Sequence, residues 1–286
     1  MKEHYLREDL ATEARPEELF QWATRVAEQA RDEDVYRNKE GRKTLRFICR
    51  GKPYFLKLHT GIGWAEIFKN LLQLRLPVLG ARNEYEAVNK LRNLGVDTMS
   101  VAAYASEGLN PSAIKSLIVT DDLVGTISLE DYCADWATQP PDTAARLALI
   151  KKLADSASRM HDAGINHRDF YLCHFHLDPD TLVSGDAGPC TVRCYLIDLH
   201  RAQLRKVTPR RWRVKDLAGL YFSAMDIGLS QRDVFRFMHH YCEGGLREAL
   251  GPQADIWCDV ARRATKLYQK DHGKMPPPLA GGMSIR

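Results

Sequence analysis

The sequence predicts an α+β fold of two lobes, a small antiparallel-sheet lobe followed by a mainly helical lobe. Short strand-like runs joined by tight turns dominate the first part of the chain, and apolar residues at helical spacing dominate after about residue 124. We therefore expect an N-terminal extension and sheet lobe over residues 1–123, a helical lobe over residues 124–270, and a flexible Pro- and Gly-rich tail over residues 271–286.

The composition is that of an ordinary globular protein. The chain has 286 residues, of which 44% are hydrophobic and 27% are charged, enough to bury a substantial core. A net charge of +4 is too small to indicate nucleic-acid binding by itself. The seven cysteines include no CxxC pair, which suits a reducing compartment. Because no signal peptide or membrane-spanning run is visible, we expect a cytoplasmic protein.

The sheet lobe is predicted from five strand-like runs. Three of them form a meander joined by NKEG and GK turns, and two more follow a helix expected over residues 82–94. The runs are VYR, KTLRFICR, PYFLKLH, TMSVAAYAS and SAIKSLIVTDDL. A helix is also expected over residues 16–30, where apolar residues repeat at helical spacing after Pro16 and two glutamates.

Residues 61–80 form an unusual insertion ahead of the helix over residues 82–94. An apolar stripe at helical spacing runs along it, made of Trp64, Ile67, Phe68, Leu71 and Leu72. This stripe either packs on its own lobe or offers an apolar surface to a lipid-bearing substrate or a membrane.

The second lobe is predicted from helix signals. One helix is expected over residues 143–163, with Asp142 as its N-cap and Gly164 as its C-cap. Further helices are expected over DLAGLYFSAM, over SQRDVFRFMHHY, where Ser230 and Asp233 form a capping box, and over residues 254–269.

Three charged residues lie in or at the end of apolar runs, where a charge needs a partner. His167-Arg168-Asp169 has the form of a kinase catalytic loop, in which the aspartate accepts a proton from the attacking hydroxyl. Asp198 follows the strand-like run TVRCYLI, and Lys57 lies within PYFLKLH. This order of lysine, His-Arg-Asp and aspartate is that of a phosphotransferase with a bilobal, protein-kinase-like fold.

In such an arrangement the first lobe would bind ATP. Lys57 would hold the phosphates and pair with Glu84, which lies beside the buried face of its helix. The turn over residues 38–42 has one glycine and no GxGxxG, so its grip on the phosphates is left open. The last strand-like run of the first lobe ends in the segment that includes Asp121 and Leu123, which would be the linker between the lobes. Backbone groups of this segment could form hydrogen bonds with an adenine.

The second lobe would hold a metal ion. Asp198 offers the carboxylate oxygen that Mg²⁺ prefers. His174 occupies the position where the kinase signature has a second, asparagine ligand, so either His174 contacts the metal or phosphate, or one ion held by Asp198 suffices. Asp216 is placed to brace the catalytic loop from the next helix.

The basic stretch over residues 201–215 is the best indication of the acceptor. It holds seven basic residues and no acidic one, and Arg side chains favour phosphate and carboxylate. Its candidate acceptor-binding residues are Arg201, Arg205, Arg210, Arg211 and Arg213. Only Trp212 interleaves with them, which disfavours single-stranded nucleic acid, and we expect no nucleic-acid partner.

Several stretches resemble the lipopolysaccharide core heptose (I) kinases, the WaaP/RfaP family, over about residues 35–270. They are GIGWAEIFKNLL, LPVLGARNEYEA, HDAGINHRDFYLCHF, LIDLHRAQ and RWRVKDLAGLYFSA. The resemblance implies a protein-kinase-like fold and phosphorylation, with ATP and Mg²⁺, of the first inner-core heptose at its 4-hydroxyl. It implies Asp169 as catalytic aspartate, flanked by His167 and Arg168, with Asp198 as metal ligand and Lys57 as nucleotide lysine.

The resemblance also implies a place of work and partners. The acceptor would be a lipid A-core glycolipid, met at the cytoplasmic face of the inner membrane, and an acyl carrier protein is suggested as a partner. Two other functions stay open: a kinase of similar fold acting on protein or another small molecule, and a catalytically weak kinase-like binding module. The weak phosphate loop and His174 keep the second one open.

Overall fold

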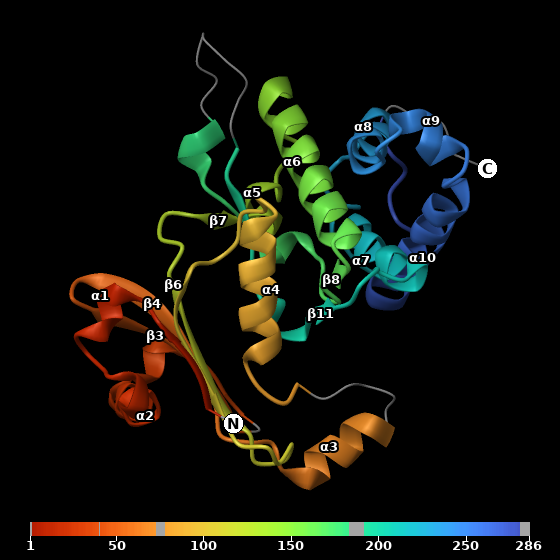
Figure 1. Ribbon diagram of the computed structural model, residues 1–286. Helices are drawn as coiled ribbons and strands as arrows, with labels where there is room; N and C mark the ends of the chain where they lie inside the picture. The colour runs from red at the N-terminus through yellow and green to blue at the C-terminus, as the bar shows by residue number, and fades with distance from the viewer. Residues whose placement is uncertain (1, 40, 73–77, 183–191, 281–286) are drawn as a thin grey trace. The chain divides into compact units, whose positions relative to one another are not determined.

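The computed structural model describes residues 2–39, 41–72, 78–182 and 192–280 (Figure 1). The chain divides into two compact units. Unit 1 holds residues 1–90, 99–124 and 199–201, and unit 2 holds residues 91–98, 125–198 and 202–286. The division after Val124 lies one residue from the predicted end of the sheet lobe.

Unit 1 is built on an antiparallel sheet, of which β3, β4 and β6 are labelled in Figure 1. The sheet has six strands in the order β1-β5-β6-β4-β3-β2. Its strands are β1 (Lys2–Leu6), β2 (Val35–Lys39), β3 (Arg42–Cys49), β4 (Lys52–His59), β5 (Val101–Glu107) and β6 (Lys115–Asp121). The five predicted strands are confirmed. The sixth, β1, was not predicted because its sequence KEHYL is largely polar. It pairs along β5 at the edge of the sheet, where polar residues are tolerated.

One face of this sheet is covered by two short helices, α1 (Glu8–Ala11) and α2 (Leu19–Gln29). The helix predicted over residues 16–30 begins with a 3₁₀ turn, η1 (Pro16–Glu18), before α2. Leu19 and Trp22 of α2 join Leu56 of β4 in one buried cluster. Removing this apolar surface from water is the main force that holds the helices on the sheet.

Side chains alternate between the two faces of a strand, so Lys57 of β4 lies on the face opposite Leu56. On that face it pairs with Glu84 of α4 (Arg82–Asn93). Tyr85 of α4 stacks on Tyr104 of β5, with ring centroids 4.1 Å apart. The chain reaches α4 through α3 (Gly63–Leu72).

The apolar stripe predicted on residues 61–80 is divided in the structure. Ile67 is buried, whereas Trp64, Phe68 and Leu72 are exposed by 50%, 58% and 85%. On α3, one residue of the stripe is therefore packed inward and three face solvent. The side chain of Leu71 and residues 73–77 lie outside the described part of the chain.

Unit 2 is mainly helical. Its described helices are α5 (Leu129–Tyr132), α6 (Thr143–Asp162), α7 (Arg210–Ser223), α8 (Gln231–Tyr241), α9 (Gly245–Leu250) and α10 (Ala254–His272). Two small sheets accompany them, formed by β7 (Ile127–Ser128), β8 (Ile165–Asn166), β9 (Phe175–Leu177), β10 (Cys194–Leu196) and β11 (Gln203–Leu204). β9 lies between β7 and β10, and β8 pairs with β11.

The predicted caps of unit 2 are largely confirmed. Asp142 accepts hydrogen bonds from Ala144 N and Ala145 N at 2.8 and 3.1 Å, and α8 has the capping box of Ser230 and Asp233. Ala163 rather than Gly164 is the C-cap of α6. Gly164 follows at φ +82°, the left-handed conformation that favours glycine.

Two predictions about unit 2 need correction. Helix α7 starts at Arg210, six residues before DLAGLYFSAM, so the second half of the basic stretch is helical. Pro209 at its N-cap and the good helix formers Arg and Lys explain the early start. The predicted flexible tail is packed over part of its length: residues 271–272 end α10, and Ala280 N donates to Leu229 O at 2.8 Å.

Within the described ranges, no helix is both long enough and apolar enough to cross a bilayer.

Candidate active site

In unit 1 the predicted ion pair of Lys57 and Glu84 is present. Lys57 Nζ lies 2.6 Å from Glu84 Oε1, and the two side chains are exposed by 18% and 0%. Glu84 Oε2 is buried without a hydrogen-bond partner among the described residues. A buried carboxylate without a partner is costly, so the ion pair compensates the charge of Glu84 and fixes the lysine ammonium on this face of the sheet.

His59, a residue that the sequence analysis missed, lies on the same face of β4 as Lys57. Its side chain is 2% exposed, and Nδ1 has no hydrogen-bond partner among the described residues. Burial lowers the pKa of His59 to about 3, and the nearby Arg42, Lys57, His200 and Arg37 lower it further. The imidazole is therefore neutral at physiological pH.

The β2–β3 turn contains a single glycine, Gly41, and its role in binding phosphates was left open by the sequence. Gly41 anchors this turn to the end of β4. Thr60 N donates to Gly41 O at 2.8 Å, and a side chain at Gly41, where φ is +68°, would meet Gly61 O at 2.2 Å. Only glycine fits this approach, so the turn is anchored to the end of β4 by its backbone.

Asp121, predicted to bind adenine, is engaged in the fold. Its carboxylate pairs with Arg7 at 2.5 Å and with Lys52 at 2.8 Å, and its amide donates to Ser100 O. Burial raises the pKa of Asp121, but the bonds from Arg7 and Lys52 outweigh it and the net pKa is below the usual range. The carboxylate and the amide N–H of Asp121 thus hold the sheet together, and its part in nucleotide binding stays a prediction.

In unit 2, Asp216 of α7 holds the predicted catalytic loop as expected. Its Oδ2 accepts the backbone N–H of His167 at 2.6 Å, and its Oδ1 accepts that of Arg168 at 2.9 Å. Arg168 has φ +79°, a conformation that costs about 1–3 kcal/mol for a residue other than glycine. The two hydrogen bonds to the buried carboxylate of Asp216 offset that strain and fix the backbone immediately before Asp169.

His167 supports the loop from inside. It is fully buried, which lowers the pKa of its imidazole and keeps it neutral. Nε2 lies 2.9 Å from Ile197 O and Nδ1 lies 3.3 Å from Asp169 N, so Nε2 carries the proton and Nδ1 accepts. His167 therefore ties the segment before Asp198 to Asp169 and does not face a substrate.

His174 and Asp198, the two residues predicted to hold a metal ion, lie close to one another. His174 Nε2 is 3.8 Å from Asp198 Oδ2, and His174 Nδ1 donates to Asp169 O at 2.6 Å. Burial lowers the pKa of His174, but its contacts with Cys173, Asp169 and Asp198 outweigh that and raise it to about 9. Within the described ranges no group of three or more His, Cys, Asp or Glu is arranged around a metal position. One carboxylate suits Mg²⁺, which takes its other ligands from phosphates and water.

The predicted acceptor arginines divide into three groups. Arg210 pairs with Asp259 at 2.6 Å, and Arg213 pairs with Asp162 at 2.8 Å. Arg205 and Arg211 lie around the indole of Trp212. Arg201 belongs to the turn η5 (Leu199–Arg201) of unit 1.

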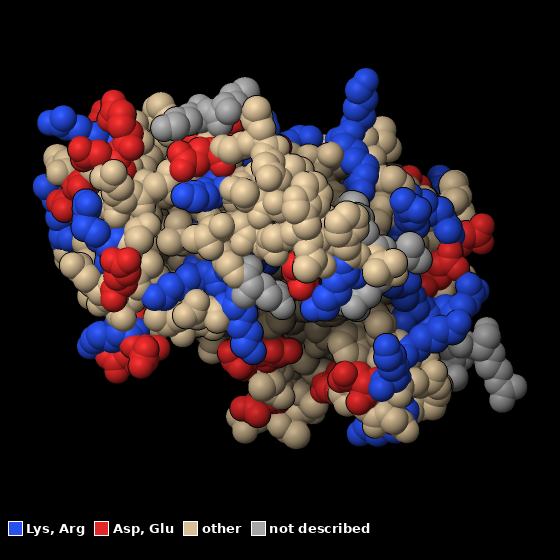
Figure 2. All heavy atoms as spheres, turned by 90° about the horizontal axis from the view of Figure 1, so that it is seen from below, with Lys and Arg blue, Asp and Glu red and all other residues tan. Residues whose placement is uncertain are grey.

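Basic and acidic side chains are interspersed on the face drawn in Figure 2, as expected from the small net charge. Local pairing therefore says more about an arginine than its position in a basic stretch.

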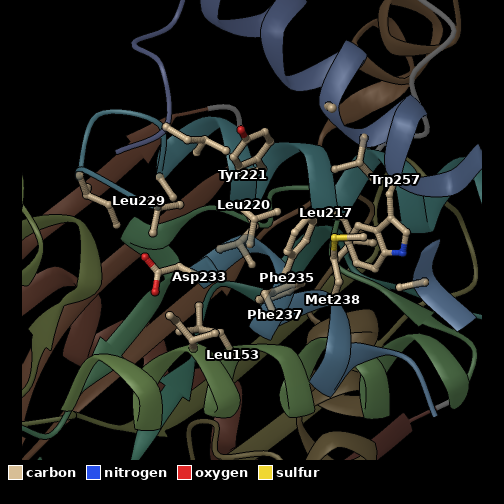
Figure 3. Close-up of a pocket in the computed structure, with 18 of the residues that line it drawn as sticks. Leu153, Leu217, Leu220, Tyr221, Leu229, Asp233, Phe235, Phe237, Met238 and Trp257 are labelled. Atoms are coloured by element: carbon tan, nitrogen blue, oxygen red, sulfur yellow. The ribbon is translucent and has the colours of Figure 1, made fainter. Parts of the chain in front are cut away.

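Unit 2 also has a partly open apolar cavity of about 330 Å³ between α6, α7, α8 and α10 (Figure 3). Leu153, Leu220, Phe237 and Trp257 line it. Asp233, also at its wall, is neutralised by Arg146 at 2.7 Å. The volume falls in the range of roughly 300–1,000 Å³ that is usual for ligand pockets.

Comparison with known proteins finds a matching family model and similar sequences. Residues 26–241 match the model of the "Lipopolysaccharide kinase (Kdo/WaaP) family". Lipopolysaccharide core heptose(I) kinase WaaP of Escherichia coli is 51% identical over 83% of this chain and 88% of its own length. The protein of that name from Pseudomonas aeruginosa is 49% identical over 82% of this chain and 87% of its own length.

A solved structure is also similar. It is described as "WaaP in complex with acyl carrier protein", with 39% identity, a TM-score of 0.77, and coverage of 93% of this chain and 99% of that chain. The expected α+β, protein-kinase-like fold is therefore confirmed.

Proposed function

Because the chain belongs to the lipopolysaccharide kinase (Kdo/WaaP) family, we propose that it transfers a phosphoryl group from ATP to heptose I of the lipopolysaccharide inner core, at the 4-hydroxyl. Family membership makes the chain a phosphotransferase that uses ATP. The observation that carries the proposal is the catalytic loop held on Asp216 at 2.6 and 2.9 Å, in a chain 51% identical to a named heptose(I) kinase.

Residues of unit 1 bind the nucleotide in this proposal. Lys57, oriented by Glu84, contacts the phosphates, where an ammonium neutralises the oxygens' charge. Leu123 at the end of unit 1 offers its backbone to adenine, whereas Asp121 only supports that segment through Arg7 and Lys52.

Residues of unit 2 hold the metal and prepare the acceptor. Asp198 is the Mg²⁺ ligand, with His174 beside it at 3.8 Å. When bound, Mg²⁺ neutralises charge on the phosphate oxygens. Asp169 orients the acceptor hydroxyl and takes its proton as the phosphoryl group is transferred, while His167 and Arg168 fix the loop that carries it.

The test is a reaction of purified enzyme with ATP, Mg²⁺ and a glycolipid that ends at the unphosphorylated heptose, and NMR of the product locates the phosphate. Asp169→Asn is expected to lower kcat by at least about 10³-fold with an unchanged melting temperature. Protein substrates and aminoglycosides serve as alternative acceptors. Preferred transfer to either, or equal turnover by Asp169→Asn, would contradict the proposal.

We further propose that the enzyme works at the cytoplasmic face of the inner membrane, because its acceptor is a glycolipid anchored there. Trp64, Phe68 and Leu72 of α3 are exposed apolar side chains of the kind that enter a lipid interface. Flotation with vesicles is expected for the native chain and is expected to weaken for Phe68→Ser with Leu72→Ser.

An acyl carrier protein is the proposed protein partner. The similar solved structure is a complex with one, and the apolar cavity of unit 2 is suited to an acyl chain. Acylated carrier is expected to bind more tightly than unacylated carrier, and narrowing the cavity with Leu153→Phe should remove that difference. Equal binding of both carriers would exclude the cavity as the acyl site.

A further inference from the structure

Four cationic side chains of unit 2 surround the indole ring of Trp212. The ring centroid lies 5.7 Å from the guanidinium carbons of Arg168 and Arg205, 5.4 Å from that of Arg211, and 5.3 Å from Lys215 Nζ. Significant cation–π contacts occur about once per 70–80 residues. Attraction to a ring explains one or two cations, but it does not explain four like charges gathered at one tryptophan.

The charge of Arg205 and Arg211 is not balanced by carboxylates in the described part of the chain. Arg211 has no ion pair there, and Arg205 donates to the neutral oxygens Asn166 Oδ1 and Gln203 Oε1 at 2.5 and 2.6 Å. By contrast Arg210 and Arg213, on the same helix as Arg211, each have a carboxylate within 2.8 Å. Burial and Arg211 lower the pKa of Arg205, as expected for an uncompensated cation.

The helix that carries two of these cations makes the cluster less favourable still. Arg211 and Lys215 lie in the first turns of α7, whose first turn has no acidic residue, although the N-terminal end of a helix repels cations. Trp212 Nε1 is buried and has no hydrogen-bond partner among the described residues. An anion at this place would relieve the repulsion and could accept from the indole N–H.

The backbone holds the cluster beside the catalytic loop. Arg205 N donates to Gly164 O at 2.8 Å, and β11 pairs with β8, which leads directly into His167. A side chain at Gly164 would meet Arg205 O at 2.0 Å, so the two segments are in close backbone contact. Arg168 is fixed by Asp216 and precedes Asp169 in the chain.

We propose that Arg168, Arg205, Arg211 and Lys215, with Trp212, bind an anionic group of the acceptor, a phosphate or a carboxylate, near the hydroxyl that is phosphorylated. This proposal rests on the proposed function. Guanidinium forks bind both kinds of anion through paired hydrogen bonds. Of the five arginines predicted from the sequence, Arg205 and Arg211 contact the acceptor, whereas Arg210 and Arg213 serve the fold. Arg168 and Lys215 are added to the set.

The first test compares steady-state kinetics of the native chain and Arg205→Gln with Arg211→Gln. The KM for the glycolipid acceptor is expected to rise about 10–100-fold, the loss typical of hydrogen bonds to a charged group. The KM for ATP and the ATP hydrolysis without acceptor are expected to stay within about twofold. Arg263→Gln, an exposed arginine on α10, controls for the loss of surface charge and is expected to leave both KM values unchanged.

The acceptor is then changed in matched ways. Enzymatically dephosphorylated acceptor and carboxyl-reduced acceptor are assayed with the native chain and the double variant. The modification that removes the bound anion should raise the native KM about 10-fold or more and leave the variant's KM nearly unchanged, which identifies the group. The proposal is wrong if, with both modified acceptors, the KM for the acceptor still differs as much between the native chain and the double variant as it does with the unmodified acceptor. It is also wrong if the double variant raises the KM for ATP instead.

A third measurement separates this proposal from the proposed function. Inorganic phosphate is titrated against the full chain with its nucleotide site filled by Mg²⁺ and a non-hydrolysable ATP analogue, and the melting temperature is followed. Phosphate is expected to stabilise the native chain and the Arg263→Gln control but not the double variant. Equal stabilisation of the double variant would exclude the cluster as an anion site, even if the heptose is phosphorylated. If the enzyme does not phosphorylate heptose, but phosphate stabilises the native chain and not the double variant, only the proposed function is wrong.

Discussion

Lys57 Nζ lies 2.6 Å from Oε1 of a Glu84 side chain that is entirely buried. Either partner alone would be a charge in an apolar setting, so the pair has both a structural and a proposed chemical role. Breaking a buried pair from one side costs about 3–5 kcal/mol, whereas replacing both partners with apolar residues often costs little.

Variants of this pair should separate the two roles. Lys57→Met is expected to lower the free energy of unfolding by about 3–5 kcal/mol, because Glu84 is then buried without its partner. It is also expected to abolish transfer, because the proposed phosphate contact of Lys57 is lost. Lys57→Met with Glu84→Leu should recover most of the stability and none of the activity. Urea unfolding and ATP titration measure the two effects. A double variant no more stable than Lys57→Met would contradict this account.

Removing the charge of Asp216 should weaken the catalytic loop. Asp216→Asn keeps the size of the side chain but replaces one acceptor oxygen with a donor that faces a backbone N–H. We expect a loss of about 1–3 kcal/mol in stability and a large fall in kcat. Asp169→Asn is the matched comparison, since it should lower kcat without the loss of stability. An Asp216→Asn chain with native stability and kcat would show that the two bonds are not needed.

The pKa of His174, raised to about 9, predicts a change in stability at alkaline pH. A group whose folded pKa is above its unfolded value of about 6.5 contributes stability that is complete below pH 6.5 and is lost as pH rises through 9. The loss should reach at most about 3 kcal/mol, measured as the urea midpoint between pH 6 and 10. His174→Gln, which can still donate to Asp169 O, should flatten this dependence. Mg²⁺ should also bind more tightly as His174 loses its proton, because the cation next to Asp198 is removed.

His59 predicts the opposite behaviour at acid pH. Its pKa in the folded chain, about 3, is below the unfolded value, so the unfolded chain takes up the proton first and stability falls as pH drops below 6.5. Between pH 6.5 and 4.5 this residue alone should cost about 2–3 kcal/mol. His59→Leu, of similar volume and unable to titrate, should remove that part of the loss. An unchanged acid profile in His59→Leu would show that other groups cause it.

The sequence predicted features that local patterns and residue chemistry determine. The five strands and the Lys57–Glu84 pair follow from alternation and from helical spacing. The bracing of the catalytic loop by Asp216 follows from a charge at the start of an apolar helix segment.

The features that were missed depend on tertiary contacts. His59 resembles any residue of an apolar strand, and only the structure shows that its Nδ1 lies buried among cations. The gathering of Arg168 and Arg205 at Trp212 depends on the pairing of β8 with β11, two-residue strands too short to leave a sequence pattern. Which arginines of the basic stretch have carboxylate partners was likewise set by α6 and α10, far along the chain.

The strand β1 occupies the outer side of β5, whose residues are almost all buried. Without β1, β5 would present a row of unsatisfied N–H and C=O groups on an apolar strand, which is a template for strand addition by another copy. By covering this edge of the sheet, β1 protects the chain from aggregation. Proteolytic removal of β1 would therefore lower solubility before it lowered catalytic activity.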